Sequence, residues 1–139
     1  MKRFLAVMLV AAALLCAFIP SSSFTEDEQT VLLARVIYTM ARDESYTTKL
    51  ALGTVVMNRV EDPWFSDTLR GVLEEQQQFP AGSRYDDESL KAAHDVLSGA
   101  RALAPNALYW RRSDSPGPFD DRAQVGSSGS YRFYSASGI

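Results

Sequence analysis

The spacing of apolar residues along the first half of the chain predicts two consecutive helices. In the first, from Thr25 to about Arg42, apolar residues recur at helical intervals and should face a core: Leu33, Val36, Ile37 and Met40. Thr25 is suited to cap this helix, because a glutamate follows it three residues later. The second helix is predicted over about 48–60, with Ser45 or Thr47 as its N-cap.

Two shorter helices are predicted next. The segment Ser66-Asp67-Thr68 supplies capping residues for the third helix, which fades in a run of glutamines. The fourth begins at Asp86-Asp87-Glu88, where acidic side chains complement the positive end of the helix dipole. It ends at Gly99, since glycine readily adopts the conformation that follows a helix C-terminus.

The last third of the chain changes from helical to strand character. Short strands are predicted at 106–110 and 131–134, and the 18 residues between Ser113 and Ser130 are rich in Ser, Gly, Pro and Asp. A loop of that length in a compact domain is usually functional or mobile. The chain is therefore predicted to be an α+β domain, mainly helical, with a small C-terminal β element.

Residues 1–23 have the pattern of a secretory signal peptide. Two basic residues precede an uninterrupted apolar run over 4–19, and Pro20 with three serines supplies small residues suited to a cleavage site. The run has 16 residues, fewer than the roughly 20 of a transmembrane helix. An uncleaved N-terminal anchor remains an alternative. The pattern predicts export of residues 24–139, with the membrane reached only through the N-terminal segment.

The composition of residues 24–139 excludes several classes of site. This part holds 12 Lys plus Arg and 17 Asp plus Glu, a net charge of −5, with no basic block for nucleic acid. Its one histidine, His94, and its lack of cysteine exclude a disulfide and a zinc site of His and Cys ligands. No phosphate-binding loop is present. We expect no metal and no cofactor, and a monomer whose chemistry, if any, depends on carboxylates.

Ordered motifs extend over most of residues 32–134. They are Tyr38-x-x-Ala41-Arg42-x-Glu44, Val55-Val56-Met57-Asn58-Arg59-Val60, Gly71-Val72-Leu73 with Gln78-Phe79, Ala92-Ala93-x-Asp95-Val96-Leu97-x-Gly99, Ala107-Leu108-Tyr109, Val125-Gly126 and Arg132-Phe133-Tyr134. In this order and spacing they resemble the cell wall hydrolase family typified by the spore cortex-lytic enzymes. The resemblance implies a lysozyme-like, lytic-transglycosylase-like fold, peptidoglycan as partner, cleavage of its glycan strands, and a secreted or cell-wall location.

The chain departs from that family at its catalytic residue. The family motif is Tyr-x-Glu-Ala/Ser-Arg-Gly-Glu, and its first glutamate, taken as the catalytic acid, falls on Met40. Glycosidic cleavage needs a carboxylic acid to protonate the leaving oxygen, and a thioether has no proton to give. A positioned general acid contributes typically 10²–10⁴-fold in rate. Glu44, the family's second glutamate, is the alternative acid, one helical turn further if the helix continues.

The residues predicted to bind substrate are better preserved than the acid. Aromatic faces that stack on sugar rings are offered by Tyr38, Phe79, Tyr109 and Trp110. Hydrogen bonds to glycan groups are predicted from Arg42, Asn58 and Gln78. Each has a structural alternative, since Phe79 fits a core and Asn58 fits a helix end.

Three functions therefore remain open from the sequence. The first is an exported enzyme that cuts peptidoglycan glycan strands with an acid such as Glu44. The second is a catalytically silent relative that binds the wall, because Met40 replaces the family acid. The third is an exported domain that binds another protein and keeps the fold as a scaffold.

Overall fold

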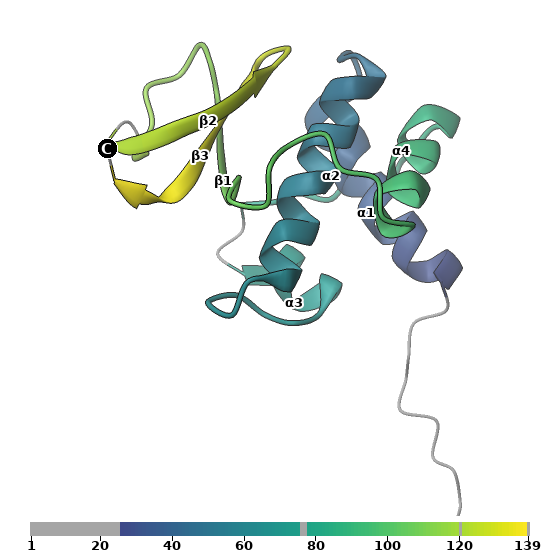
Figure 1. Ribbon diagram of the computed structural model, residues 1–139. Helices are drawn as coiled ribbons and strands as arrows, with labels where there is room; N and C mark the ends of the chain where they lie inside the picture. Colours follow the sequence, from purple (N-terminus) through teal and green to yellow (C-terminus); the bar gives the residue numbers. More distant parts are fainter. Residues whose placement is uncertain (1–25, 76–77, 120, 139) are drawn as a thin grey trace, which may run out of the picture.

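The computed structural model describes residues 26–75, 78–119 and 121–138, which form four helices and a three-stranded sheet (Figure 1). The helices are α1 (Glu26–Ala41), α2 (Tyr46–Glu61), α3 (Leu69–Glu74) and α4 (Asp87–Leu97). The strands are β1 (Tyr109–Arg112), β2 (Arg122–Ser128) and β3 (Tyr131–Gly138). The predicted N-terminal segment 1–23 and the cap Thr25 lie outside the described residues.

Local side-chain hydrogen bonds set where three of the helices begin. The side chains of Ser45, Thr68 and Asp86 each accept a hydrogen bond from the backbone N–H three residues further on. The bonds from Ser89 also hold the pKa of Asp86 below its usual value, because they favour the carboxylate. Gly99, with φ of 111°, follows the last helix, as its sequence position predicted.

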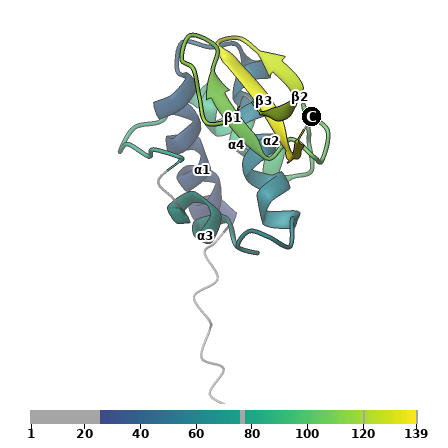
Figure 2. The same cartoon turned by 90° about the vertical axis from the view of Figure 1, so that its left-hand side faces the viewer.

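One apolar core joins the helices to the sheet. The predicted stripe of α1 is buried, and α2, α3, α4 and β3 close around it. The fully buried apolar side chains of this core include Leu33, Val36, Ile37, Leu52, Val55, Val56, Val72, Val96 and Phe133. Figures 1 and 2 show the sheet lying on one side of the helices. This arrangement brings the C-terminal end of α1 near the β2–β3 turn.

The sheet has the order β1-β3-β2, with both pairings antiparallel. The prediction of a single loop over 113–130 was wrong, because β2 lies within it. Its sequence, Arg-Ala-Gln-Val-Gly-Ser-Ser, has a single β-branched apolar residue and carries little strand signal. Pairing with β3, whose Tyr131, Phe133 and Tyr134 are buried, makes it a strand.

The predicted fold class is confirmed, since a helical majority is followed by a small antiparallel sheet. Among the residues that the structure describes, no helix has both the length and the apolar character required to cross a membrane.

Candidate functional site

A polar pocket of about 390 Å³ lies where α1 ends and the β2–β3 turn approaches it. It is called the Met40 pocket below, and its lining residues are Thr39, Met40, Ala41, Arg42, Asp43, Glu44, Arg112 and Ser130. Two arginines and two acidic residues give it a balanced charge. The pocket therefore brings together Met40 and Glu44, the two positions that the sequence singled out for acid chemistry.

Met40 joins the apolar core to this pocket. Its side chain belongs to the core cluster and is 9% exposed. The hydroxyl of the buried Tyr131 donates a 2.6 Å hydrogen bond to its backbone oxygen, which fixes the last turn of α1 against β3. Burial raises the pKa of Tyr131, so this hydroxyl stays a donor at neutral pH. The backbone of residue 40 is thus firmly placed, but its side chain carries no acid.

Glu44 lies on a turn and contacts the β2–β3 hairpin. The α1 helix stops at Ala41, and the amide of Glu44 donates to the Ala41 carbonyl at 3.0 Å. Its Oε1 accepts a hydrogen bond from the backbone N–H of Ser130 at 3.2 Å. Its Oε2 lies so close to Gly129 that a Cβ there would be 2.1 Å away. Both carboxylate oxygens therefore pack against the hairpin turn.

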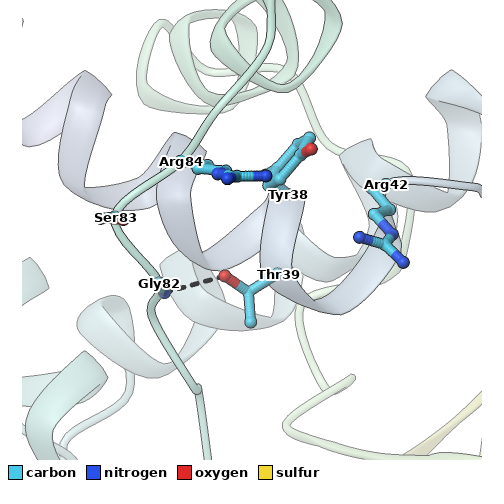
Figure 3. Close-up of a pocket in the computed structure, with 6 residues that line it drawn as sticks. All are labelled: Tyr38, Thr39, Arg42, Gly82, Ser83 and Arg84. Carbon is cyan, nitrogen blue, oxygen red and sulfur yellow. Dashed lines mark hydrogen bonds between the residues drawn. The ribbon is translucent and has the colours of Figure 1, made fainter.

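A second pocket, of about 400 Å³, lies beside the first along α1 (Figure 3). It is called the Tyr38 pocket below and is lined by Tyr38, Thr39, Arg42, Gly82, Ser83 and Arg84. The Gly82 amide donates to the Thr39 hydroxyl at 2.8 Å, and that hydroxyl donates to the Arg35 carbonyl at 2.7 Å. These two bonds hold the loop after α3 on the side of α1.

Asn58 and Gln78, both predicted to bind substrate, are engaged inside the protein. Asn58 is buried, and its amide donates to the carbonyls of Ala104 and Ala107 at 2.9 and 3.1 Å. The Oε1 of Gln78 accepts a 2.6 Å hydrogen bond from Arg59. The geometry supports the structural alternative for Asn58, which ties α2 to the segment before β1, and its contact with substrate stays a prediction.

Arg59 organises an aromatic cluster that the sequence analysis did not anticipate. Its side chain is 1% exposed, and its Nε donates to the Leu108 carbonyl at 2.7 Å. Its guanidinium lies within about 5 Å of the ring centres of Phe65, Phe79 and Tyr109. Burial lowers its pKa to about 10, so it remains charged at neutral pH. The only sequence signal for it was the Asn-Arg pair.

The predicted aromatic contacts divide between the core and its edge. Phe79 is 4% exposed and belongs to the core, so the structure supports the structural alternative for it. Tyr109 and Trp110 are half-buried. The ring centres of Tyr109 and Phe119 lie 4.9 Å apart, and those of Trp110 and Tyr131 lie 5.6 Å apart. A sugar contact by Tyr109 or Trp110 remains a prediction.

Of the predicted residues, Tyr38, Met40, Arg42 and Glu44 therefore gather around the end of α1. Sequence reasoning missed Ser130, Arg112 and Arg84, which reach the two pockets from distant segments. No local pattern marked them, because each lies in a loop or at a strand end with ordinary polar neighbours. Within the described ranges, no group of three or more His, Cys, Asp or Glu residues is placed to hold a metal ion.

Curated proteins resemble part of this chain. It is 34% identical over 89 residues to the spore cortex-lytic enzyme of Oceanobacillus iheyensis, which covers 60% of this chain and 32% of that protein. The spore cortex-lytic enzyme of Bacillus subtilis is 33% identical over 89 residues, 60% of this chain and 29% of that protein. The chain thus spans about a third of the length of these curated relatives.

Solved structures share the fold. The catalytic domain of the Bacillus cereus SleB protein superimposes with a TM-score of 0.72 at 24% identity, covering 81% of this chain and 93% of that one. The catalytic domain of the germination-specific lytic transglycosylase SleB from Bacillus anthracis gives a TM-score of 0.71 at 23% identity, covering 81% and 98%. The family profile described as Cell Wall Hydrolase matches residues 43–134, which include Glu44 and start after Met40. The chain belongs to the cell wall hydrolase family.

Proposed function

We propose that this chain is an exported peptidoglycan-binding member of its family that holds wall glycan at the Met40 pocket and does not cleave it at an enzymatic rate. Export is inferred from the signal-like pattern of residues 1–23. Peptidoglycan as the ligand is inferred from membership of the cell wall hydrolase family. The open, polar character of the pocket suits a glycan, which presents hydroxyl and amide groups.

The observation that carries the proposal is the side chain of Met40. It lies at the motif position of the family acid, is 9% exposed, and lines a pocket with four charged residues. Loss of a general acid removes typically 10²–10⁴-fold in rate, equivalent to about 3–5 kcal/mol of barrier. A pocket that keeps its shape but lacks the proton donor would bind a glycan strand and release it unchanged.

A second candidate is a glycosidase that uses Glu44, because that carboxylate lines the same pocket. For this role Glu44 would have to leave the Ser130 amide and the surface of Gly129, against which both of its oxygens pack. The hairpin contact therefore favours a structural role for Glu44 and supports the binding function over this alternative.

Two assays on purified sacculi test the proposal, with the full chain kept in mild detergent. A pull-down measures binding, and chromatography of the supernatant measures released muropeptides. The variants are Glu44→Gln and, as a matched control on the exposed surface of α3, Glu74→Gln. We expect binding without release for the wild type and for both variants.

Other outcomes reject the proposal in distinct ways. Release by the wild type that disappears only in Glu44→Gln would establish the glycosidase. Absence of binding to sacculi would reject peptidoglycan as the ligand and leave the third function, binding of another exported protein.

A further inference from the structure

The Tyr38 pocket is locally positive although the chain is acidic. Among the described residues that line it there are two guanidinium groups, from Arg42 and Arg84, and no carboxylate. Figure 3 shows these two arginines on either side of Tyr38. By contrast, residues 24–139 have a net charge of −5. A pair of arginines around an aromatic ring, within an acidic protein, is an arrangement that attracts an anionic group.

Arg84 is available to such a group. In the part of the chain that the structure describes, it forms no ion pair or hydrogen bond. The nearest acid along the chain, Asp86, is engaged as the N-cap of α4. Among the described residues, Arg42 has a single ion-pair partner, Asp43, at 3.4 Å, and the two side chains are 64% and 90% exposed. Exposed pairs of this kind contribute little energy, so Asp43 competes weakly for the guanidinium.

The backbone around Arg84 is held in place. The Gly82 amide, two residues before Arg84, is bonded to the Thr39 hydroxyl, which is bonded in turn to the Arg35 carbonyl of α1. The loop that carries Arg84 is thereby positioned against the helix that carries Tyr38 and Arg42. Because the loop is already held in place, it loses less conformational entropy when a ligand binds.

The two pockets are neighbours at the end of α1, because Thr39 and Arg42 line both. A branched ligand whose main strand occupies the Met40 pocket could therefore place a side branch in the Tyr38 pocket. The volume of about 400 Å³ is at the small end of ligand sites and is suited to a short branch of a larger polymer.

Peptidoglycan has such a branch, because its glycan strands bear short peptide stems with free carboxylates. We propose that the Tyr38 pocket binds a stem-peptide carboxylate, with Arg84 as the main donor and Arg42 as the second, while the glycan occupies the Met40 pocket. Guanidinium and carboxylate groups match in shape and can form two parallel hydrogen bonds. This inference rests on the proposed binding of peptidoglycan and adds that the chain recognises strands that carry peptides.

The test compares two soluble muropeptides that differ only in charge. One is a disaccharide tetrapeptide with free carboxylates, and the other is the same molecule with those carboxylates converted to amides. Affinities are measured by calorimetry for the full chain and for Arg84→Gln. Arg70→Gln, which removes the same charge from the exposed surface of α3, is the matched control.

We expect the wild type to bind the free-carboxylate form about threefold to tenfold more tightly, the range for an exposed but well-oriented arginine–carboxylate contact. Arg84→Gln should remove this preference, because it weakens binding of the free-carboxylate form much more than binding of the amidated form, and Arg70→Gln should leave the preference as in the wild type.

Two results would overturn the inference alone. One is equal wild-type affinity for the two muropeptides, which would leave a phosphate of another wall polymer as the anion. The other is a loss in Arg84→Gln that is the same for both forms. If neither muropeptide binds to the wild type, the proposed function itself fails and the inference fails with it. Circular dichroism of each variant confirms that the fold is retained.

Discussion

Substituting Met40 with glutamate places a carboxylic acid at the position to which the motif resemblance assigns the family's catalytic acid. The surroundings favour a productive orientation, because the Met40 backbone is held by Tyr131 and its side chain lines a pocket open to a ligand. If the rest of the site is competent, Met40→Glu should release muropeptides from sacculi 10²–10⁴-fold faster than the wild type. That gain corresponds to about 3–5 kcal/mol of activation free energy.

The substitution should also destabilise the fold by a predictable amount. Burying a methionine side chain contributes about 1.5–3 kcal/mol, and that of Met40 is 9% exposed. Part of the introduced carboxylate can reach the polar pocket, so we expect the free energy of unfolding to fall by about 2 kcal/mol. For a domain of this size the thermal midpoint should fall by about 10 °C.

Met40→Gln is the matched control, because it imposes nearly the same loss of apolar burial without an acid. Both variants should melt at similar temperatures, and only Met40→Glu should release muropeptides. The assay is chromatography of sacculus digests at a temperature where thermal melts show both variants to be folded. Equal, negligible release by the two folded variants would refute the reasoning, since it would mean that more than the acid has been lost.

Further predictions concern the hairpin, the buried amide and acid sensitivity. Gly129→Ala should destabilise the protein by about 1–2 kcal/mol, because residue 129 has a φ of 52°, which is strained for any residue with a Cβ. The added Cβ would also clash with the Glu44 carboxylate and increase this loss. Chemical denaturation should show a smaller cost in a Glu44→Ala background, and an unchanged cost would contradict the packing described. Asn58→Ala should lower the free energy of unfolding by about 1–3 kcal/mol, because the buried Ala107 carbonyl loses a donor; weaker glycan binding at unchanged stability would instead support the substrate contact. Hydrogen bonds from Lys91 and from the Tyr46 hydroxyl lower the pKa of Asp95 from 3.8 to about 2. Because the folded-state pKa is depressed, this contribution to stability should be present above pH 4 and lost as the pH falls through about 2. The thermal midpoint of Asp95→Asn should depend less on pH across that range than the midpoint of the wild type. Identical dependence in the two proteins would contradict the stabilising contacts of Asp95.

Residues far apart in the chain decide what the site can do. In the sequence, Glu44 was the alternative acid, one turn beyond Met40 if the helix continued past its predicted end at about Arg42. The helix ends at Ala41, and the Glu44 carboxylate accepts a hydrogen bond from the amide of Ser130, 86 positions later. Asn58 looked like a sugar-binding side chain, but its partners lie in the segment before β1. In each case the residue type was noticed correctly, and its partner could not be read from the sequence.

The sequence by itself determined the four helices, the caps of the last three and the family, and it singled out Met40 as a departure from the family motif. These features depend on interactions within a few residues, such as the bond from a capping Ser45 side chain to the backbone of its own first turn. Only the tertiary structure decided that β2 is a strand, that Arg59 is buried among aromatic rings, and that Arg84 and Tyr38 line the same pocket. Those features arise from contacts between distant segments, whose energies appear only after the core has brought the segments together.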